Sequence, residues 1–337
     1  MKSNYRYIVK AFMAMAVIAG TTSCDDFLDR EPMSSISPET YYSTAAQLEA
    51  NLNDEYPNVL PSFGQWTYGI FGEDKGTDNQ IEVNANDRYT QDRWKVPHSE
   101  SDNWKFERIY RINFFLSEAL PKFGEDMSGS QNTISGSVAT IKHYIGEMYF
   151  LRAYEYFKKL QLFGDFPIIN QPLADEMEAL REASKRFPRN EVARFIISDL
   201  DKAYAYMSDV DMATTRINKD AAMLVKSRVA LFEATWLQNF KGTAFVPGGE
   251  GWPGASLHNN YQYPSGNLDN EVKYFLEQAV EASKLVADKY KGNLTENTGV
   301  LQQSADDPSN PYFDMFAQED LSDVKAVSYT HLRAHET

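Results

Sequence analysis

The sequence predicts a mostly α-helical protein built as an array of helical hairpins, and two observations support this fold class. Several long segments repeat apolar residues at spacings of three and four, which gathers those residues on one face of a helix. Segments that alternate apolar and polar residues are scarce, and only the short stretches 80–83 and 166–169 are candidates for strands. A chain of helices without a sheet must bury its apolar stripes by packing helix against helix.

The first two predicted helices are 103–120 and 138–163. The apolar face of the first consists of Ile109, Ile112, Leu116 and Ala119. Pro121 should stop this helix, because proline lacks the backbone donor and clashes with the preceding turn. The second helix is broadly apolar and should end at Gly164, since glycine readily adopts the backbone conformation that terminates helices.

Three further helices are predicted over 191–207, 219–240 and 270–290. Asn190 and Asn218 should cap the first two, because an asparagine side chain accepts a hydrogen bond from a free backbone N–H. The apolar stripe of the third helix consists of Val272, Phe275, Ala279, Ala282 and Val286. Short connections between helices of this size are typical of a stacked solenoid, so we expect a divergent tetratricopeptide-like array with long irregular loops.

Two long loops, 56–102 and 241–268, are rich in glycine, tryptophan and tyrosine. Loops longer than about 12–15 residues are uncommon unless they are functional or disordered. A sugar ring presents apolar C–H faces and a rim of hydroxyls, so aromatic side chains with nearby polar groups can hold it. The candidate ligand-binding residues are Trp66, Tyr68, Tyr89, Trp94 and Trp252, with Asp74 and Asp78 as polar contacts. The alternative is that each ring packs over the helices beneath it.

The N-terminus has the pattern of a lipoprotein signal. Three basic residues precede the apolar run 11–20, which is shorter than the roughly 20 residues that a membrane-spanning helix needs. A basic start, a short apolar middle and small residues at the end are typical of a secretory signal. We expect cleavage before Cys24 and several acyl chains on that residue, which would anchor the protein durably. The alternative is an ordinary cysteine beside a simple cleavage site.

The charge and motif content limit the function classes. The 337 residues include 33 Lys and Arg and 48 Asp and Glu, for a net charge of −15. Nucleic acid phosphates would repel such a chain, so nucleic acid is excluded as a partner. The single cysteine excludes an internal disulfide. Zincin, nucleophile-elbow and phosphate-loop motifs do not occur, and we expect no catalytic residues and no metal site.

Four segments follow from these patterns. We expect a signal peptide over 1–23, a lipidated tether over 24–40 and a helical domain over 41–323. Residues 324–337 differ in composition from the acidic body, since they hold two of the five histidines, and we predict that they are a non-native tail. The helical domain should then be incomplete at its C-terminus, which would leave apolar faces such as the stripe on 270–290 uncovered.

Residues 146–173, GEMYFLRAYEYFKKLQLFGDFPIINQPL, resemble the most recognisable stretch of the SusD-like (RagB) family of outer-membrane nutrient-binding lipoproteins. The matching residues are Gly146, Glu147, Phe150, Leu151, Arg152, Ala153, Tyr154, Phe157, Leu162, Phe163, Gly164, Asp165 and Pro167. The segments 23–32, 104–116, 190–203 and 217–236 also agree, in the same order, so the resemblance spans roughly 23–323.

The resemblance implies a function. Such proteins are lipid-anchored at the cell surface, bind an oligosaccharide or another nutrient, and deliver it to a SusC-like TonB-dependent transporter in the outer membrane. No cofactor is implied beyond the lipid on Cys24. Asp74 and Asp78 match an acidic pattern of the family and could hold Ca²⁺, but their spacing is not that of an EF-hand loop, and structural capping is the simpler role.

The matching helix should serve structure rather than chemistry. Phe150, Tyr154 and Phe157 share one face, as core residues do. Arg152 should pair with a carboxylate or cap carbonyl groups between helices. Two alternative functions stay open: a helical-repeat scaffold whose ligand is another protein, and a secreted glycoside hydrolase, because carboxylates are plentiful.

Overall fold

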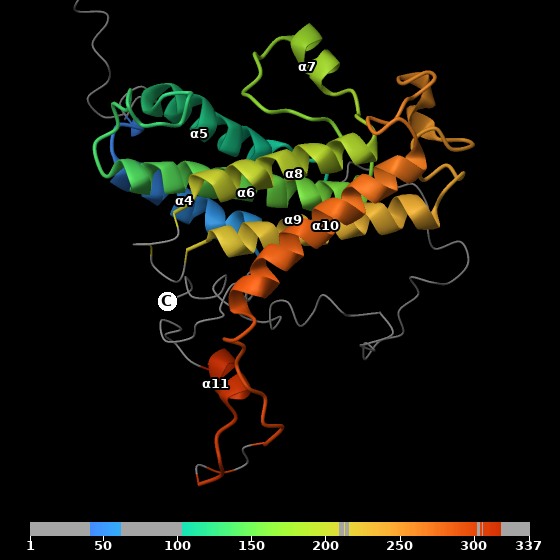
Figure 1. Cartoon of the computed structure of the whole chain (residues 1–337). Coiled ribbons are helices and arrows are strands. Elements are labelled where there is room, and N and C mark those ends of the chain that lie inside the picture. The colour runs from blue at the N-terminus through green and yellow to red at the C-terminus, as the bar shows by residue number, and fades with distance from the viewer. Residues whose placement is uncertain are drawn as a thin grey trace, which may run out of the picture. The chain divides into compact units, whose positions relative to one another are not determined.

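The computed structural model describes residues 41–61, 103–208, 212, 216–301, 304 and 306–317. Contacts divide the chain into Met1–Tyr41 and Tyr42–Thr337, and the second unit holds the helices (Figure 1). In chain order the elements are α4 (Ala45–Val59), α5 (Glu107–Phe123), α6 (Val138–Phe163), α7 (Met177–Ala183), α8 (Arg189–Tyr206), α9 (Lys219–Asn239), the 3₁₀ helix η3 (Pro253–Ser256), α10 (Leu268–Tyr290) and α11 (Pro311–Ala317).

The long helices stack on their neighbours in the chain, as the predicted array requires. Helix α6 packs against α4, α5 and α8, helix α8 packs against α9, and α9 packs against α10 (Figure 1). Pairing in the described ranges is limited to isolated bridges, such as the one between Phe166 and Phe187, and no strand forms there. The predicted fold class is therefore confirmed, while the predicted strand 166–169 is wrong.

Helix α6 lies at the centre of this stack and has the predicted bounds. Its buried residues point in every direction around its axis, and Met148, Leu151 and Tyr156 are inaccessible to solvent. The predicted core residues Phe150 and Phe157 are buried as well, and Tyr154 is half-buried. The helix ends at Gly164, whose φ of 68° lies in the region that favours glycine.

Three predicted helix ends are wrong. The helix predicted over 103–120 begins only at Glu107. Helix α5 continues through Pro121 and ends before Gly124, because a proline in the last turn removes only one backbone hydrogen bond from the helix. Helix α8 begins two residues earlier than predicted, at Arg189, so Asn190 lies inside the first turn. Asn190 does not cap this helix; its side-chain amide donates to Tyr261 and Glu271 at 2.9 and 3.0 Å.

Other local predictions are confirmed. The Asn218 side chain caps α9 by accepting the N–H of Ala221 at 2.9 Å. Helix α4 was not predicted, although Leu48, Leu52, Tyr56 and Val59 have helical spacing and are buried.

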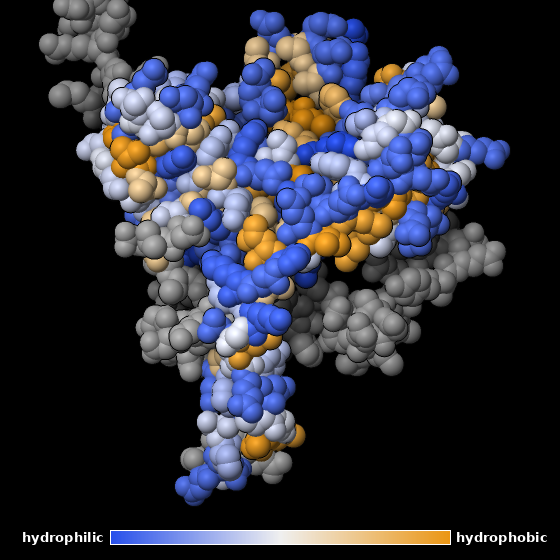
Figure 2. All heavy atoms as spheres, viewed as in Figure 1, coloured by the Kyte–Doolittle hydropathy of each residue, from blue (hydrophilic) through white to orange (hydrophobic). Residues whose placement is uncertain are grey.

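The predicted apolar stripe of α10 is covered rather than exposed. Phe275, Ala279, Ala282 and Val286 are buried, and α9 is the helix that α10 packs against, so the expectation of an uncovered stripe on 270–290 is wrong. Exposed apolar residues lie on both flanks of the buried stripe of α10, and Figure 2 shows hydrophobic residues gathered in a band along this helix. These exposed residues are Leu276, Val280 and Leu285.

Several predictions lie outside the described residues: the signal over 1–23, the tether with Cys24, the strand over 80–83 and the tail over 324–337. Among the helices of the described ranges, none is long and apolar enough to span a membrane.

Candidate functional site

Trp252 is the predicted ligand residue that the structure describes. Its side chain is buried, with 5% of its surface exposed, and its indole N–H donates to the Asp165 carboxylate at 2.7 Å. The ring packs against His258 and Tyr261 of the same loop, and it also forms part of a cavity wall. The other predicted residues lie outside the described residues: Trp66, Tyr68, Asp74, Asp78, Tyr89 and Trp94.

An aromatic cavity of about 650 Å³ lies where the end of α6, the segment that leads into α8, the end of α9 and the following loop meet. This volume is within the range of about 300–1,000 Å³ that small-molecule sites occupy. The cavity is lined by residues 161–165, Arg186, Arg189, Trp236, Ala244, Phe245, residues 252–254 and Leu257. We call this space the aromatic cavity.

Asp165 holds three parts of the aromatic cavity together. Its carboxylate accepts the backbone N–H of Arg189 at 2.9 Å and the indole N–H of Trp252 at 2.7 Å. It thus joins the turn after α6 to the start of α8 and to the loop after α9. Burial raises the pKa of Asp165 above its ordinary value, and both hydrogen bonds oppose this shift because they stabilise the charged form.

Arg189 forms the polar floor of the cavity. Its Nε donates to both carboxylate oxygens of Glu233, at 3.0 and 3.1 Å, and its Nη2 donates to one of them at 2.9 Å. The guanidinium carbon lies 4.1 Å from the ring centroid of Trp236, a stacked cation–π contact. Burial raises the pKa of Glu233, and the adjacent guanidinium opposes that shift.

The rim of the aromatic cavity is apolar and open to solvent. Phe245 has 61% of its surface exposed, and Leu162 and Leu257 are also exposed. Arg186 stands at the same rim, with its guanidinium 4.6 Å from the ring centroid of Trp104. Exposed apolar residues gathered around a hollow are typical of a binding site.

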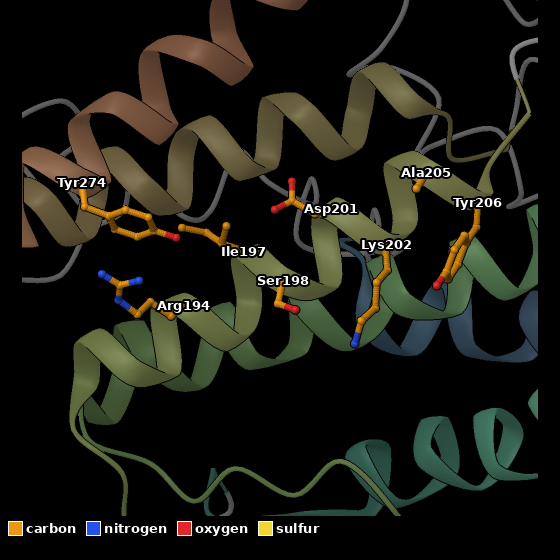
Figure 3. A pocket seen from close by; sticks show the side chains of 8 residues that line it. All are labelled: Arg194, Ile197, Ser198, Asp201, Lys202, Ala205, Tyr206 and Tyr274. Atoms are coloured by element: carbon orange, nitrogen blue, oxygen red, sulfur yellow. The ribbon is translucent and has the colours of Figure 1, made fainter. Parts of the chain in front are cut away.

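A second hollow, of about 380 Å³, runs along the exposed face of α8 (Figure 3). Arg194 and Tyr274 lie side by side at one end, and Tyr206 lies at the other. The charged groups of this groove already have partners: Arg194 binds Glu271, Asp201 binds Lys226 at 2.7 Å, and Lys202 lies 3.7 Å from Asp199. The aromatic cavity is larger and has an exposed apolar rim, so it is the stronger candidate for a ligand site.

The histidines of the described ranges serve structure. His143 is buried, its Nδ1 accepts the backbone N–H of Ser208 at 2.8 Å, and its Nε2 lies 2.9 Å from the Glu147 carboxylate. His258 lies 2.8 Å from the carbonyl oxygen of Arg186. Within the described part of the chain, no three His, Cys, Asp or Glu side chains gather as a metal site would require.

The sequence analysis missed most of the cavity residues. Trp236 fell within the predicted helix 219–240, Arg189 just before the predicted helix 191–207, and residues 162–165 within the segment that resembles the family. Their meeting depends on how α6, α8 and α9 pack, and no local pattern encodes that packing. One signal was available, because the turn after α6 and the loop after α9 are two of the segments where aromatic residues lie outside the predicted helices.

The described part of the chain is therefore a stacked helical array that carries an open aromatic cavity. Residues 26–231 match the SusD-like family model that is described as "Starch-binding associating with outer membrane". This match covers more than half of the chain, and the protein belongs to the SusD-like family. The resemblance of residues 146–173 is confirmed.

Curated relatives carry the same family name. SusD-like protein P2 of Formosa agariphila is 25% identical over 253 residues, which are 72% of this chain and 46% of the relative. SusD-like protein P25 of the same organism is 25% identical over 233 residues, which are 64% of this chain and 41% of the relative. The chain therefore spans less than half the length of these two relatives.

Solved structures of the same family are more distant. A SusD-like carbohydrate binding protein from Bacteroides vulgatus is 13% identical, with a TM-score of 0.43 over 77% of this chain and 47% of that chain. A laminarin binding SusD-like protein is 20% identical, with a TM-score of 0.31 over 40% of this chain and 26% of that chain.

Proposed function

We propose that this protein binds a glycan at the cell surface and delivers it to a SusC-like TonB-dependent transporter, without catalysing a reaction. The observation that supports glycan binding most directly is the aromatic cavity, whose walls offer ring faces and whose floor offers a charged donor. Sugar C–H faces stack on aromatic rings, while hydroxyls exchange hydrogen bonds with polar side chains. Membership of a family described by starch binding and outer-membrane association supports both parts of the proposal.

Binding should be weak, which suits a protein that must release its ligand. Few ring contacts are available, and each hydroxyl exchanges a bond to water for a bond to protein at small net gain. We expect a Kd of about 10⁻⁵–10⁻³ M for a soluble oligosaccharide.

Replacing Phe245 by alanine should lower glycan affinity at least tenfold, about 1.4 kcal/mol, because an exposed platform ring is lost. The melting temperature should hardly change, since the ring has 61% of its surface exposed. Calorimetry with a panel of neutral oligosaccharides measures the affinity, and scanning calorimetry measures the melting temperature. The matched control is Tyr110→Ala, which removes an exposed aromatic ring of α5 and should leave affinity unchanged.

The other possible results of these measurements distinguish between the alternative functions. Unchanged affinity in Phe245→Ala would indicate that the glycan does not bind in the aromatic cavity, and it would favour the loop residues Trp66 and Trp94 as the binding site. A failure of every oligosaccharide to bind would favour the protein-binding scaffold. Shortened products after incubation would favour the glycoside hydrolase.

The lipid anchor is a second, separate part of the proposal. Cys24→Ala should abolish acylation, because the thiol is the group that carries the diacylglycerol. We expect the variant to leave the membrane fraction and to lose palmitate label. A variant that stays in the outer membrane and keeps the label would show that Cys24 is not the lipidated residue.

A further inference from the structure

We infer that Asp165 is a positioning residue of the aromatic cavity: its charged carboxylate holds the Trp252 ring in the cavity wall, and protonation of that carboxylate loosens the wall. The control of the wall follows from the geometry of the described residues. The consequence for sugar binding rests on the proposed function, since it requires that the ligand occupies this cavity. The cavity would then be ready for its ligand only while Asp165 is charged.

The two oxygens of Asp165 serve two different segments. Oδ2 accepts the indole N–H of Trp252 at 2.7 Å, and Oδ1 accepts the backbone N–H of Arg189 at 2.9 Å. A charged carboxylate has only acceptors, so it serves both donors at once. A protonated carboxyl group carries a donor of its own, and its neutral oxygens accept hydrogen bonds roughly half as strong as those of the charged form. Protonation therefore weakens the attachment of the ring.

The Trp252 ring depends on this bond for its attachment to the turn after α6. Among the described residues, the rings that stack on it are His258 and Tyr261, with centroids 5.9 and 5.6 Å away, and both belong to the loop that carries Trp252. The loop has further anchors, because His258 lies 2.8 Å from the carbonyl oxygen of Arg186 and the Tyr261 hydroxyl bonds to Asn190. Loss of the indole bond should therefore turn the ring without unfolding the loop.

Gly254 shows how closely the ring is seated. A Cβ atom built on Gly254 would lie 2.2 Å from Cζ2 of Trp252 and 2.5 Å from its Cε2, too close for any side chain. The ring thus lies directly on the backbone of its own loop, with its N–H edge towards Asp165. Because Trp252 and Gly254 both line the aromatic cavity, a turn of the ring changes the shape of the cavity.

The titratable groups around Asp165 come from the segment that leads into α8, from the start of α8, from α9 and from the loop after α9: Arg186, Arg189, Glu233, His258 and Tyr263. The two arginines favour the charged carboxylate, and Glu233 repels it. Burial nevertheless raises the pKa of Asp165 above its ordinary value, so the proton is taken up at milder acidity than on an exposed aspartate. His258 stacks on Trp252, so its own titration must be separated from that of Asp165.

A sugar that requires the intact wall is linked to this proton. Because the charged form of Asp165 holds the wall, the sugar binds that form more tightly. Acidification through the pKa of Asp165 should then lower the affinity, and by reciprocity the bound sugar should lower the pKa of Asp165.

The first test needs no ligand, because it follows the indole N–H resonances of the unaltered protein by NMR from pH 8 to pH 4.5. Trp236 is an internal control: it lines the same cavity, but its indole N–H donates at 3.0 Å to the carbonyl oxygen of Phe245, which does not titrate. We expect the Trp252 proton, assigned by its loss in Trp252→Phe, to move upfield on acidification as its hydrogen bond weakens. In Asp165→Asn this movement should vanish, whereas a movement caused by His258 would persist.

The second test measures affinity by calorimetry, with the tightest-binding member of the neutral oligosaccharide panel as the probe. From pH 7.5 to pH 4.5 the Kd of the unaltered protein should rise roughly fivefold or more, the size expected for one weakened hydrogen bond. Asp165→Asn resembles the protonated carboxyl group, so it should bind with the weaker affinity already at pH 7.5 and hardly respond to pH. Trp252→Phe keeps an aromatic ring without the N–H and should behave alike, and adding Asp165→Asn should cause little further loss.

Asp220→Asn is the matched control. Asp220 is also a buried aspartate, and it accepts hydrogen bonds from Lys289 and Tyr290 that join α9 to α10, away from the aromatic cavity. This variant should lose thermal stability, yet it should keep the affinity of the unaltered protein and its dependence on pH.

The outcomes separate the role of Asp165 from the proposed function. A Trp252 resonance that does not move with pH, or that moves equally in Asp165→Asn, would overturn the control of the wall. Affinity that is independent of pH and unchanged in Asp165→Asn would overturn the role in binding, while the proposed function stands. If no oligosaccharide binds at any pH, the proposed function fails, and the resonance titration alone decides whether Asp165 controls the wall. Should Asp165→Asn not fold, an unchanged pH dependence in Trp252→Phe is the contradicting result.

Discussion

Replacing Arg152 by alanine should lower the free energy of unfolding by about 3–5 kcal/mol, because it leaves the buried Asp199 carboxylate with Lys202, 3.7 Å away, as its one remaining charged partner among the described residues. The Arg152 side chain binds Asp199 through two nitrogens, at 2.6 and 2.8 Å, and Asp199 is inaccessible to solvent. The same guanidinium donates to the Asn113 side chain at 2.9 Å and to the carbonyl of Asn170 at 3.1 Å. One side chain of α6 thus holds α5, α8 and the segment that follows α6.

Urea denaturation followed by circular dichroism measures this loss. The matched control is Arg181→Ala on α7, whose pair with Glu178 at 3.0 Å has an Arg181 side chain that is 72% exposed. Exposed pairs contribute about 0–1 kcal/mol, so this control should barely move the midpoint. Similar small losses in both variants would contradict the idea that the buried Arg152 network holds the stack together.

The helices that were predicted well are those whose apolar pattern is strong and whose ends carry a clear signal. Residues 138–163 were predicted with the observed bounds because a long apolar segment ends in Gly164. The pairing of Arg152 with a carboxylate was also predicted, since a buried arginine in an apolar helix requires a partner. The partner is Asp199, which lies 47 positions away in the sequence. Which carboxylate pairs with Arg152 depends on how α6 packs against α8, and this could not be predicted.

The errors arose where tertiary contacts outweigh local chemistry. Asn190 has the side chain of a good cap, yet it is buried and donates to Tyr261 and Glu271 instead. The role of Trp252 as a ligand contact stays a prediction, but its hydrogen bond to Asp165 was not foreseen. In both cases a polar group found a partner 71 or 87 positions away, which sequence spacing cannot reveal.

Replacing Glu147 by alanine should also cost about 3–5 kcal/mol of unfolding free energy, for a related reason. Its carboxylate is inaccessible to solvent and accepts hydrogen bonds from Arg216 at 2.7 and 2.6 Å and from the Tyr56 hydroxyl at 2.7 Å. Burial raises the pKa of Tyr56 well above its ordinary value, so the phenol stays protonated and donates. Glu147 thereby fixes α4 and the segment before α9 to the central helix α6.

A double variant shows whether electrostatics or shape carries this cost. In Glu147→Leu alone, the Arg216 side chain, which is 5% exposed, loses its main partner. It keeps a contact of 3.3 Å to the half-exposed Glu49 and a hydrogen bond of 3.1 Å to the Asn53 side chain, and neither replaces the buried carboxylate. Adding Arg216→Met removes the stranded cation, and apolar replacement of a buried ion pair is often neutral or stabilising. We therefore expect Glu147→Leu with Arg216→Met to recover at least half of the stability that Glu147→Leu loses in urea denaturation. A double variant no more stable than the single one would mean that the shape of the ion pair, rather than its unpaired charge, sets the cost.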